Sequence, residues 1–544
     1  MDISEEVSRR RTFAIISHPD AGKTTLTEKL LLYGGAIATA GQVAARRKAR
    51  SATSDWMELE KERGISITST VLQFPYKGFT LNLLDTPGHQ DFGEDTYRTL
   101  LAADSAVMLI DAAKGVEPQT KKLFAICRAR RIPLFTFINK MDRPSRDPLE
   151  LLDELEKVLG IGAFPVNWPI GNGPSFRGVF DRTTREVHLF ERTTHGAKRA
   201  PVRVTGERDP RIAELTDATT LAEFRDSLEL LDGAGERFDR DAFIAGESTP
   251  VYFGSAVTNF GVELFLDGFI ATAPPPTPRM AVAGTESERE PIPPVSENFS
   301  GFVFKIQANM DPRHRDRVAF VRVCSGKFER DMTVRNVRTG KDVRLTRAMK
   351  LFASEREVVD EAYAGDVVGL ANPGSFAIGD TLCSGPPLRF DPIPTFAPEY
   401  FASVRSIDTS AYKSFQKALA QLREEGAIQV FFPAGQVHSE PIFGAVGELQ
   451  FEVAKYRIES EYGVRTAFTG LPYRLALRVL GEPEAIAGAS WPSNAKLVDD
   501  WAGIPVALFE SEWSVGLARE WNPALAFAGF DAQTGADASL EVAS

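Results

Sequence analysis

In the first half of the chain, apolar runs of strand length alternate with segments of helical spacing. We expect strands at residues 12–17, 79–84, 106–110, 134–138 and 251–254, with helices such as 23–33 and 147–159 between them. This alternation is typical of a mostly parallel sheet with helices on both faces. The interval between residues 142 and 255 is longer than one crossover requires, so we expect an inserted subdomain at about 160–250.

The second half of the chain has a different pattern, in which short strands are separated by turn signals. A Pro- and Glu-rich stretch at residues 272–298 comes first and predicts a linker. Period-two alternation over residues 301–370 then predicts a small β-barrel. Residues 400–462 give the order strand, helix, strand, strand, helix, which is typical of a ferredoxin-like split βαβ domain.

These patterns predict a multidomain α/β protein. We expect an α/β domain at 1–278, a linker at 279–298, a β-barrel domain at 299–390, a ferredoxin-like domain at 391–475 and a C-terminal extension at 476–544. The pattern of the extension predicts only that part of its length is folded. The α/β domain is the part in which chemistry-bearing motifs follow strands.

Composition and charge exclude several classes of protein. The 544 residues are 43% hydrophobic, and 63 Lys and Arg against 74 Asp and Glu give a net charge of −11. These values exclude a disordered chain and a broad basic surface for nucleic acid. The three cysteines form no CxxC pair, so we expect neither disulfides nor structural zinc. Since there is neither a signal-peptide pattern nor an apolar stretch of membrane-spanning length, we expect a soluble cytoplasmic protein without membrane contact.

The sequence SHPDAGKTT, residues 17–25, follows the first expected strand and begins the first expected helix. A phosphate-binding loop occupies this position, because backbone N–H groups at a helix N-terminus attract phosphate. Lys23 would add a positive charge beside the β- and γ-phosphates, and Thr24 would coordinate Mg²⁺. Ser17 replaces the first glycine of the usual GxxxxGK[ST] pattern, so this segment alone also fits an ordinary turn at a helix start.

Three further segments follow apolar strands. In DTPGH, residues 85–89, the Asp85 carboxylate can hold the Mg²⁺ shell through water, and the Gly88 N–H can meet a γ-phosphate. In NKMD, residues 139–142, the Asp142 carboxylate can accept hydrogen bonds from N1–H and the 2-amino group of guanine, a donor pair that adenine lacks. Ser255 and Ala256 fit a last base-contacting loop. Each segment alone could be a turn, but their order predicts a guanine-nucleotide site.

The predicted GTP- and GDP-binding residues come from these four segments. They are Ser17, His18, Pro19, Asp20, Ala21, Gly22, Lys23, Thr24, Thr25, Asp85, Thr86, Pro87, Gly88, His89, Asn139, Lys140, Met141, Asp142, Ser255 and Ala256.

SHPDAGKTT, DTPGH and NKMD resemble the motifs of the translational GTPases, which are elongation and release factors that act on the ribosome. The segments 301–332 and 445–464 resemble, within that family, the bacterial class II peptide-chain release factors. This second resemblance runs from about residue 8 to about 470 and is weakest in the tail after 475.

The resemblance implies roles for individual residues. His89 would be the catalytic residue that positions the attacking water once the ribosome has organised the site. Residues 51–69 resemble the first switch region of the family, in which Ser66 would stand in for threonine as a ligand of Mg²⁺ beside Thr24 and Asp85.

Two further roles concern the surroundings of this histidine and of the phosphate-binding loop. Asp20 matches a position that the family uses for a monovalent cation. Pro19 and Ile65 match the apolar pair that flanks the histidine.

The implied function is that of a monomeric, ribosome-activated GTPase of translation termination, which promotes dissociation of class I release factors after peptide release. The alternative is another ribosome-binding translational GTPase, such as an elongation factor G-like translocase or a ribosome-recycling factor. The remainder after the ferredoxin-like domain is too short for the further domains of a translocase. His89 opposes a non-catalytic GTP-gated module, and Asn139 with Asp142 opposes an ATP-dependent kinase.

Overall fold

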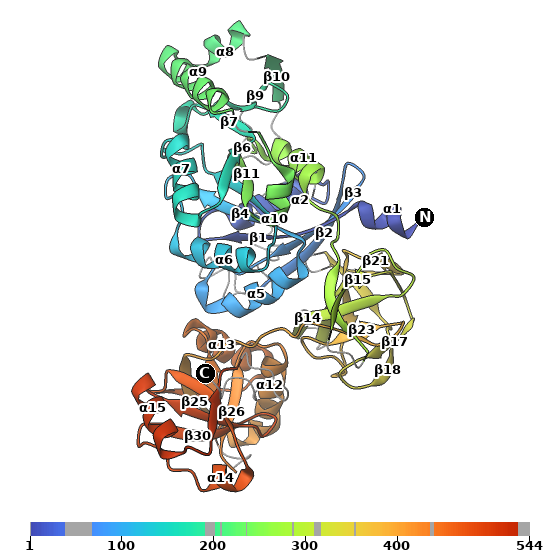
Figure 1. Cartoon of the computed structure of the whole chain (residues 1–544), viewed down its shortest axis with the longest axis vertical. Coiled ribbons are helices and arrows are strands. Elements are labelled where there is room, and N and C mark those ends of the chain that lie inside the picture. Colours follow the sequence, from blue (N-terminus) through green and yellow to red (C-terminus); the bar gives the residue numbers. More distant parts are fainter. Residues whose placement is uncertain are drawn as a thin grey trace.

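The structure is a computed structural model of the chain. It describes residues 2–37, 68–190, 202–206, 209–235, 237–284, 288–308, 317–352, 355–435 and 440–530. In Figure 1 the α/β domain lies above the β-rich second domain and the C-terminal domain, and both of these lie next to it.

The first domain is built on a seven-stranded sheet with the strand order β2-β3-β1-β4-β5-β11-β6. The strands are β1 (Arg10–Ser17), β2 (Thr70–Tyr76), β3 (Phe79–Asp85), β4 (Ser105–Asp111), β5 (Leu134–Asn139), β6 (Gly162–Pro165) and β11 (Ser248–Phe253). The edge strand β2 runs antiparallel to β3, and the other pairings are parallel. The prediction of a mostly parallel sheet is confirmed.

Helices cover both faces of this sheet. They are α2 (Lys23–Tyr33), α5 (Gly93–Ala102), α6 (Pro118–Ala129), α7 (Pro148–Glu154), α10 (Arg240–Ala245) and α11 (Val262–Thr272), with short helical turns η2 (Gln90–Phe92) and η3 (Leu155–Leu159). The N-terminal helix α1 (Ile3–Ser8) instead packs through Val7 on Tyr363 and Ala364 of the second domain. Phe13 and Ile15 of β1 belong to the core shared with α2 and α11, whereas Ala14 and Ile16 belong to the core shared with α5 and α6. Because both faces are covered, the loops at the carboxyl ends of the strands form the exposed edge where ligands bind in such sheets.

The interval expected to hold an insertion contains a second, four-stranded sheet with the order β10-β9-β8-β7. Its elements are β7 (Asn167–Ile170), η4 (Gly173–Ser175), β8 (Gly178–Asp181), β9 (Glu186–Phe190), β10 (Val202–Gly206), α8 (Pro210–Leu215) and α9 (Ala218–Gly233). This part forms the upper end of the molecule in Figure 1.

The second domain is an eight-stranded antiparallel sheet that curls around its own apolar core, with β16 and β21 as a separate pair. Its strands are β14 (Ser300–Ala308), β15 (Arg317–Ser325), β16 (Lys327–Glu329), β17 (Thr333–Asn336), β18 (Lys341–Arg344), β19 (Ala348–Phe352), β20 (Glu355–Val358), β21 (Glu361–Tyr363), β22 (Val367–Ala371) and β23 (Thr381–Cys383). The order within the large sheet is β18-β17-β23-β14-β15-β22-β19-β20.

The segment expected to be a linker, 279–298, holds two strands. They are β12 (Arg279–Ala283) and β13 (Arg289–Ile292), and β12 also pairs with β24 (Leu388–Phe390). The chain therefore enters and leaves the second domain through one small antiparallel sheet.

The C-terminal domain begins with the ferredoxin-like order β28-β25-β27-β26, in which all pairs are antiparallel. Its elements are β25 (Tyr400–Ser406), η6 (Thr409–Ala411), α12 (Tyr412–Glu424), β26 (Gln429–Pro433), β27 (Ile442–Ala445), α13 (Leu449–Tyr462) and β28 (Thr466–Leu471). Strand β30 pairs with β26, so the sheet continues into the segment expected to be an extension. That segment supplies β29 (Leu475–Leu480), α14 (Pro483–Ala487), β30 (Ala495–Asp500), β31 (Pro505–Phe509), α15 (Glu512–Trp521) and β32 (Ala526–Ala528).

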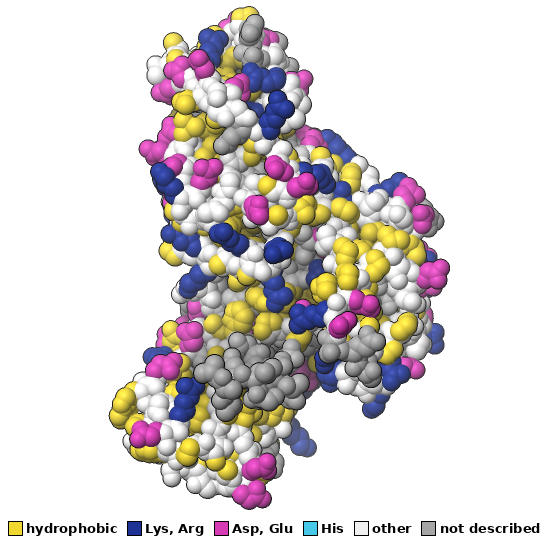
Figure 2. Space-filling model, in the orientation of Figure 1, with side chains coloured by type: hydrophobic (Ala, Val, Ile, Leu, Met, Phe, Trp, Pro, Cys, Tyr) yellow, Lys and Arg dark blue, Asp and Glu magenta, His cyan; other side chains and the backbone are white. Residues whose placement is uncertain are grey.

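The face of the molecule shown in Figure 2 carries basic and acidic side chains side by side rather than a continuous basic coat. None of the helices in the described part of the chain combines the length and the apolar character that a membrane span requires.

Candidate nucleotide-binding site

The loop between β1 and α2 contains the SHPDAGKTT segment. Gly22 has φ of +100°, and a Cβ built there would lie 2.5 Å from Asn139 Nδ2, so glycine alone fits this position. Helix α2 begins at the next residue, Lys23. The first backbone N–H groups of a helix have no acceptor within it, so this loop offers donors and a positive helix end to an anion.

A cavity of about 440 Å³ opens at this loop. Its lining residues are Ser17, His18, Pro19, Asp20, Gly22, Lys23, Thr24, Thr25, Gly88, His89, Asn139, Lys140, Arg143 and Val257. The volume is in the range of small-ligand sites. Of these residues, Arg143 and Val257 are absent from the sequence-based prediction, and each directly follows a predicted segment.

The end of the cavity nearest α2 has the chemistry of a phosphate site. Lys23 Nζ lies 2.6 Å from Asp85 Oδ1, and both side chains are buried. Asp85 is at the end of β3 and pairs in register with Ile15 of β1, which brings it beside the phosphate-binding loop. Lys23 lines the cavity and is the candidate for contact with a phosphate, whereas Asp85 does not line it and is the candidate for contact with a counter-cation.

The DTPG turn packs directly on this loop. Thr86 Oγ1 donates a 2.6 Å hydrogen bond to the Ile15 carbonyl, and neither Thr86 nor Pro87 lines the cavity. A Cβ built on Gly88 would lie 3.7 Å from Pro19 Cα. Thr86 thus fixes the turn to β1, while Gly88 brings its backbone close to the phosphate-binding loop.

Asn139 joins three loops at the other end of the cavity. Its Nδ2 donates to the Ala21 carbonyl at 2.8 Å, and its Oδ1 accepts from the Ala256 N–H at 2.9 Å. The Met141 N–H donates to the Gly254 carbonyl at 3.1 Å. Ala21, Met141 and Ala256 therefore hold the loops in place but do not line the cavity, and the same is true of the buried Ser255.

Lys140 ties the NKMD segment to two other elements. Its Nζ donates to the Asp20 carbonyl at 2.5 Å and to Asp111 Oδ2 at 2.7 Å. Burial would raise the pKa of the Asp111 carboxyl, but hydrogen bonds from Lys140 and from the Ala113 N–H outweigh it and hold the pKa below its usual value. Sequence reasoning missed Asp111, although it ends β4 as Asp85 ends β3.

In the predicted nucleotide-binding segments, one buried polar atom of Asp142 and one of Ser17 have no hydrogen-bond partner in the described part of the chain. Asp142 does not line the cavity, but its Oδ1 is buried and has no hydrogen-bond partner among the described residues. Ser17 Oγ is likewise buried without a hydrogen-bond partner among the described residues. Since buried polar atoms are normally satisfied, these two atoms are candidates for contact with a ligand. The N1–H and 2-amino group of guanine would supply the donors that Asp142 lacks.

His89 lines the cavity with a side chain that is 32% exposed. Its Nδ1 accepts the Asp91 N–H at 3.2 Å, and its ring lies edge-on to Phe92 at 6.2 Å between centroids. The residue thus begins the turn η2, and its Nε2 is the ring nitrogen left for a water. His18, the other histidine at the cavity, has Nε2 3.3 Å from Glu117 Oε1.

Two residues implied by the resemblance, Ser66 and Ile65, lie outside the described residues. Thr24 lines the cavity and Asp85 is paired with Lys23, so both remain candidates for the metal end of the site. Asp20 is exposed at the cavity wall with φ of +66°.

Three family models match successive parts of the chain. The Elongation factor Tu GTP binding domain matches residues 8–275, Elongation factor G domain 2 matches 298–385, and the Class II release factor RF3, C-terminal domain matches 390–519. A "Peptide chain release factor 3" from Gloeobacter violaceus is 60% identical over 526 residues, which are 96% of this chain and 98% of that protein. The chain belongs to the peptide chain release factor 3 family.

Other release factor 3 proteins are similar over the same length. That of Synechococcus elongatus is 57% identical over 524 residues, or 96% of this chain and 93% of that protein. A crystal structure of a protein from Thermus thermophilus shares the fold, with a TM-score of 0.67 at 23% identity over 91% of this chain and 72% of that one.

Membership in the release factor 3 family makes the chain a GTPase of translation termination, which binds guanine nucleotide. The resemblance seen in the sequence is confirmed. The C-terminal family model extends to residue 519, well beyond the expected boundary at 475, in agreement with the continuous sheet of that domain.

Proposed function

We propose that the chain hydrolyses GTP when bound to the ribosome and thereby promotes dissociation of class I release factors after peptide release. The observation that carries the proposal is that His89 and Lys23 line one cavity. A water oriented by His89 would then face the γ-phosphate held at the Lys23 end.

The reaction needs positioning and charge neutralisation rather than a covalent intermediate. Lys23 and the N–H groups at the start of α2 would stabilise charge on the γ-phosphate. Mg²⁺ held by Thr24, by Ser66 and, through water, by Asp85 would neutralise further phosphate charge. A monovalent cation near Asp20 would add to this neutralisation. Asp142 would select guanine.

The ribosome is the proposed activator because His89 is engaged in a local turn in the free chain. Its Nδ1 accepts the Asp91 N–H, and Gly88 lies against Pro19. Reorienting the ring by contact with ribosomal RNA or protein would complete the site, much as a group supplied in trans does in other GTPases, with an effect of about 10³–10⁵ on the rate. We infer a monomeric, cytoplasmic protein without membrane contact.

The experiment is a His89→Ala variant. We expect near-normal GTP binding, normal ribosome association and loss of ribosome-stimulated turnover, because the proposed role of the ring is toward the water and its Nδ1 bond stays within the local turn. The variant should displace a class I release factor once and then stay on the ribosome with GTP.

Multiple-turnover hydrolysis and a single-round assay of release-factor dissociation give these readouts. His188→Ala, in β9 of the insertion, is the matched histidine control and should behave as wild type. Full ribosome-stimulated turnover by His89→Ala would refute the catalytic role, and lost GTP binding would assign the residue to the structure of the turn.

A further inference from the structure

A lysine of the second domain contacts the nucleotide domain next to the GTP site. Lys305 lies on β14, where a β-bulge shifts the register between Val303 and Lys305. Val303 and Ile306 both face the core of the second domain. The bulge therefore turns Lys305 outward, toward the first domain, where its side chain is only 6% exposed.

Lys305 donates to two of the three polar groups of Ser69. Its Nζ donates to the carbonyl oxygen and to Oγ of Ser69, each at 2.6 Å. It also lies 3.4 Å from Asp95 Oδ2 on α5, and that same oxygen accepts the Ser69 N–H at 2.9 Å. Ser69 is thus held between a cation of the second domain and a carboxylate of the first.

The charges in this cluster support one another. Burial would raise the pKa of the Asp95 carboxyl, but Lys305 and the hydrogen bonds from Ser69 outweigh it and hold the pKa below its usual value. The cluster is therefore a matched ion pair around a backbone group, and removal of one charge leaves the other poorly compensated.

Ser69 immediately precedes the residue that faces Asp85. Thr70 is the first residue of β2 and pairs in register with Asp85 at the end of β3. Strand β2 is the edge strand of its sheet, so its start has a sheet neighbour on one side only. On the other side of the cluster, Asp95 lies on α5, which follows His89 after one short turn.

We propose that Lys305 is a positioning residue for the GTP site, which fixes the start of β2 beside Asp85 and so maintains the magnesium-binding end of the cavity. The inference rests on the proposed role of Asp85 toward Mg²⁺. It gives the second domain a direct influence on nucleotide retention.

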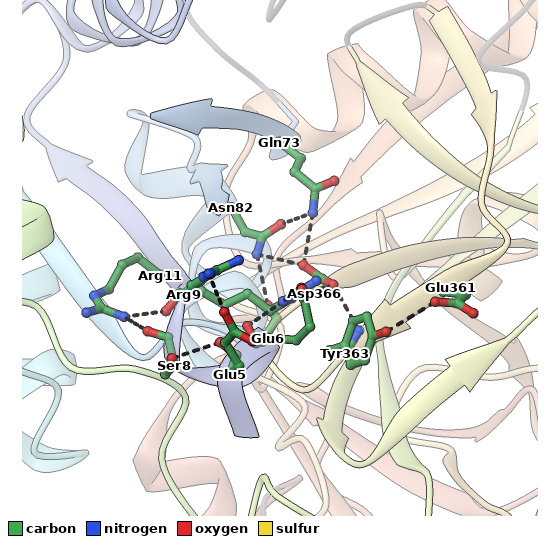
Figure 3. A network of polar contacts seen from close by, with 12 residues as sticks. Glu5, Glu6, Ser8, Arg9, Arg11, Gln73, Asn82, Glu361, Tyr363 and Asp366 are labelled. Atoms are coloured by element: carbon green, nitrogen blue, oxygen red, sulfur yellow. Dashed lines mark hydrogen bonds and ion pairs between the residues drawn. The ribbon is translucent and has the colours of Figure 1, made fainter. Parts of the chain in front are cut away.

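A second contact between the same two domains provides the control. Asp366 of the second domain accepts a 2.7 Å hydrogen bond from Arg10 Nε, and it also accepts bonds from Gln73 and Asn82. Figure 3 shows this network, with Gln73 and Asn82 directed at Asp366. Arg10 is the first residue of β1, at the opposite end of the strand from the phosphate-binding loop. An Arg10→Met variant thus loosens the interface far from the GTP site.

The test measures dissociation of fluorescent GDP and a non-hydrolysable fluorescent GTP analogue from the full chain while Mg²⁺ is titrated, without ribosomes. Charge-assisted hydrogen bonds contribute about 1.5–3 kcal/mol, which is about ten- to 150-fold in an equilibrium constant. We expect Lys305→Met to raise the Mg²⁺ concentration for half-maximal retention about tenfold. Arg10→Met should leave that concentration unchanged although it lowers thermal stability.

Amide hydrogen exchange of the nucleotide-free protein gives a readout that is independent of the ligand. Lys305→Met should accelerate exchange at Ser69 and Thr70, and Arg10→Met, whose network reaches β2 at Gln73, should not. Asp95→Asn keeps the side-chain shape, removes the same ion pair and should change Mg²⁺ dependence in the same direction. If Lys305→Met does not fold, the Asp95→Asn variant tests the inference in its place.

Two results would overturn the inference. One is a folded Lys305→Met or Asp95→Asn variant with wild-type Mg²⁺ dependence. The other is an equal shift in Arg10→Met, which would assign the effect to general loosening of the interface. Wild-type retention that does not depend on Mg²⁺ would instead contradict the proposed metal role of Asp85, so the two failures are distinguishable.

Discussion

The Asp142→Asn variant tests guanine recognition with almost no change in side-chain size. Asp142 Oδ1 is buried without a hydrogen-bond partner among the described residues, and the preceding Met141 is fixed by its bond to the Gly254 carbonyl. The carboxylate is thus an acceptor held in a fixed place. An amide there presents at least one N–H donor toward the N1–H and 2-amino donors of guanine.

The magnitude follows from the two hydrogen bonds that are lost. Each charge-assisted bond to a carboxylate contributes about 1.5–3 kcal/mol. Loss of both costs about 3–6 kcal/mol, or about 10²–10⁴-fold in GTP affinity. Xanthine carries a 2-oxo acceptor in place of the amino group, so the same variant should bind xanthosine triphosphate better than wild type does.

Equilibrium titration with GTP, GDP and xanthosine triphosphate measures this change. Asp153→Asn, on the exposed face of α7, is the matched control and should bind as wild type. Thermal unfolding shows whether the variants are folded. A folded Asp142→Asn variant with wild-type GTP affinity would refute the assignment of Asp142 to the base.

The remaining predictions concern the phosphate end and the domain interface. Lys23→Ala should weaken binding of both GTP and GDP, and it should lower stability by about 3–5 kcal/mol because Asp85 loses the buried cation beside it. A Lys23→Met/Asp85→Asn double variant should regain stability in thermal unfolding but not nucleotide binding, and recovery of binding would contradict the assignment. The pKa of the Asp95 carboxyl is held below its usual 3.8 in the folded chain. The ion pair therefore contributes its full share of the unfolding free energy above pH 3.8, and this contribution is lost as the pH falls through the lower folded-state pKa. Urea unfolding of wild type and Asp95→Asn should therefore show a constant difference near neutral pH that shrinks below about pH 4, and a difference independent of pH would contradict this account.

Much of the first domain could be predicted because its signals are local. A buried parallel strand is a short apolar run, and a phosphate-binding loop directly follows one, so strand and motif support each other. Helix α2 occupies the residues expected for it, and twelve of the fourteen residues that line the cavity belong to the predicted segments. The other two, Arg143 and Val257, carry no motif of their own.

Pairings between distant segments were not predictable in this way. The Pro- and Glu-rich stretch suggests an extended chain, which is true of β12 and β13, but nothing in it identifies β24 as their partner. The strands of the C-terminal extension could not be predicted for a related reason. Its short strands alternate too weakly to stand alone, and their order in the sheet is set by the edge that β26 offers to β30.

The contacts that join the domains were the least predictable, because backbone groups make many of them. Lys305 binds the Ser69 carbonyl, the Leu449 N–H donates to Asp91 at 2.9 Å, and the Gly365 carbonyl accepts from Thr12 in β1. Every residue type has the same backbone carbonyl, and every type except proline has the same backbone N–H. The pattern of side chains therefore does not identify which backbone groups make these contacts. Asp91 shows the consequence, since its N–H donates to His89 Nδ1 while its carboxylate accepts the Leu449 N–H at the start of α13. A motif therefore locates the nucleotide, while the coupling of that site to the other domains depends on groups that only a folded chain brings together.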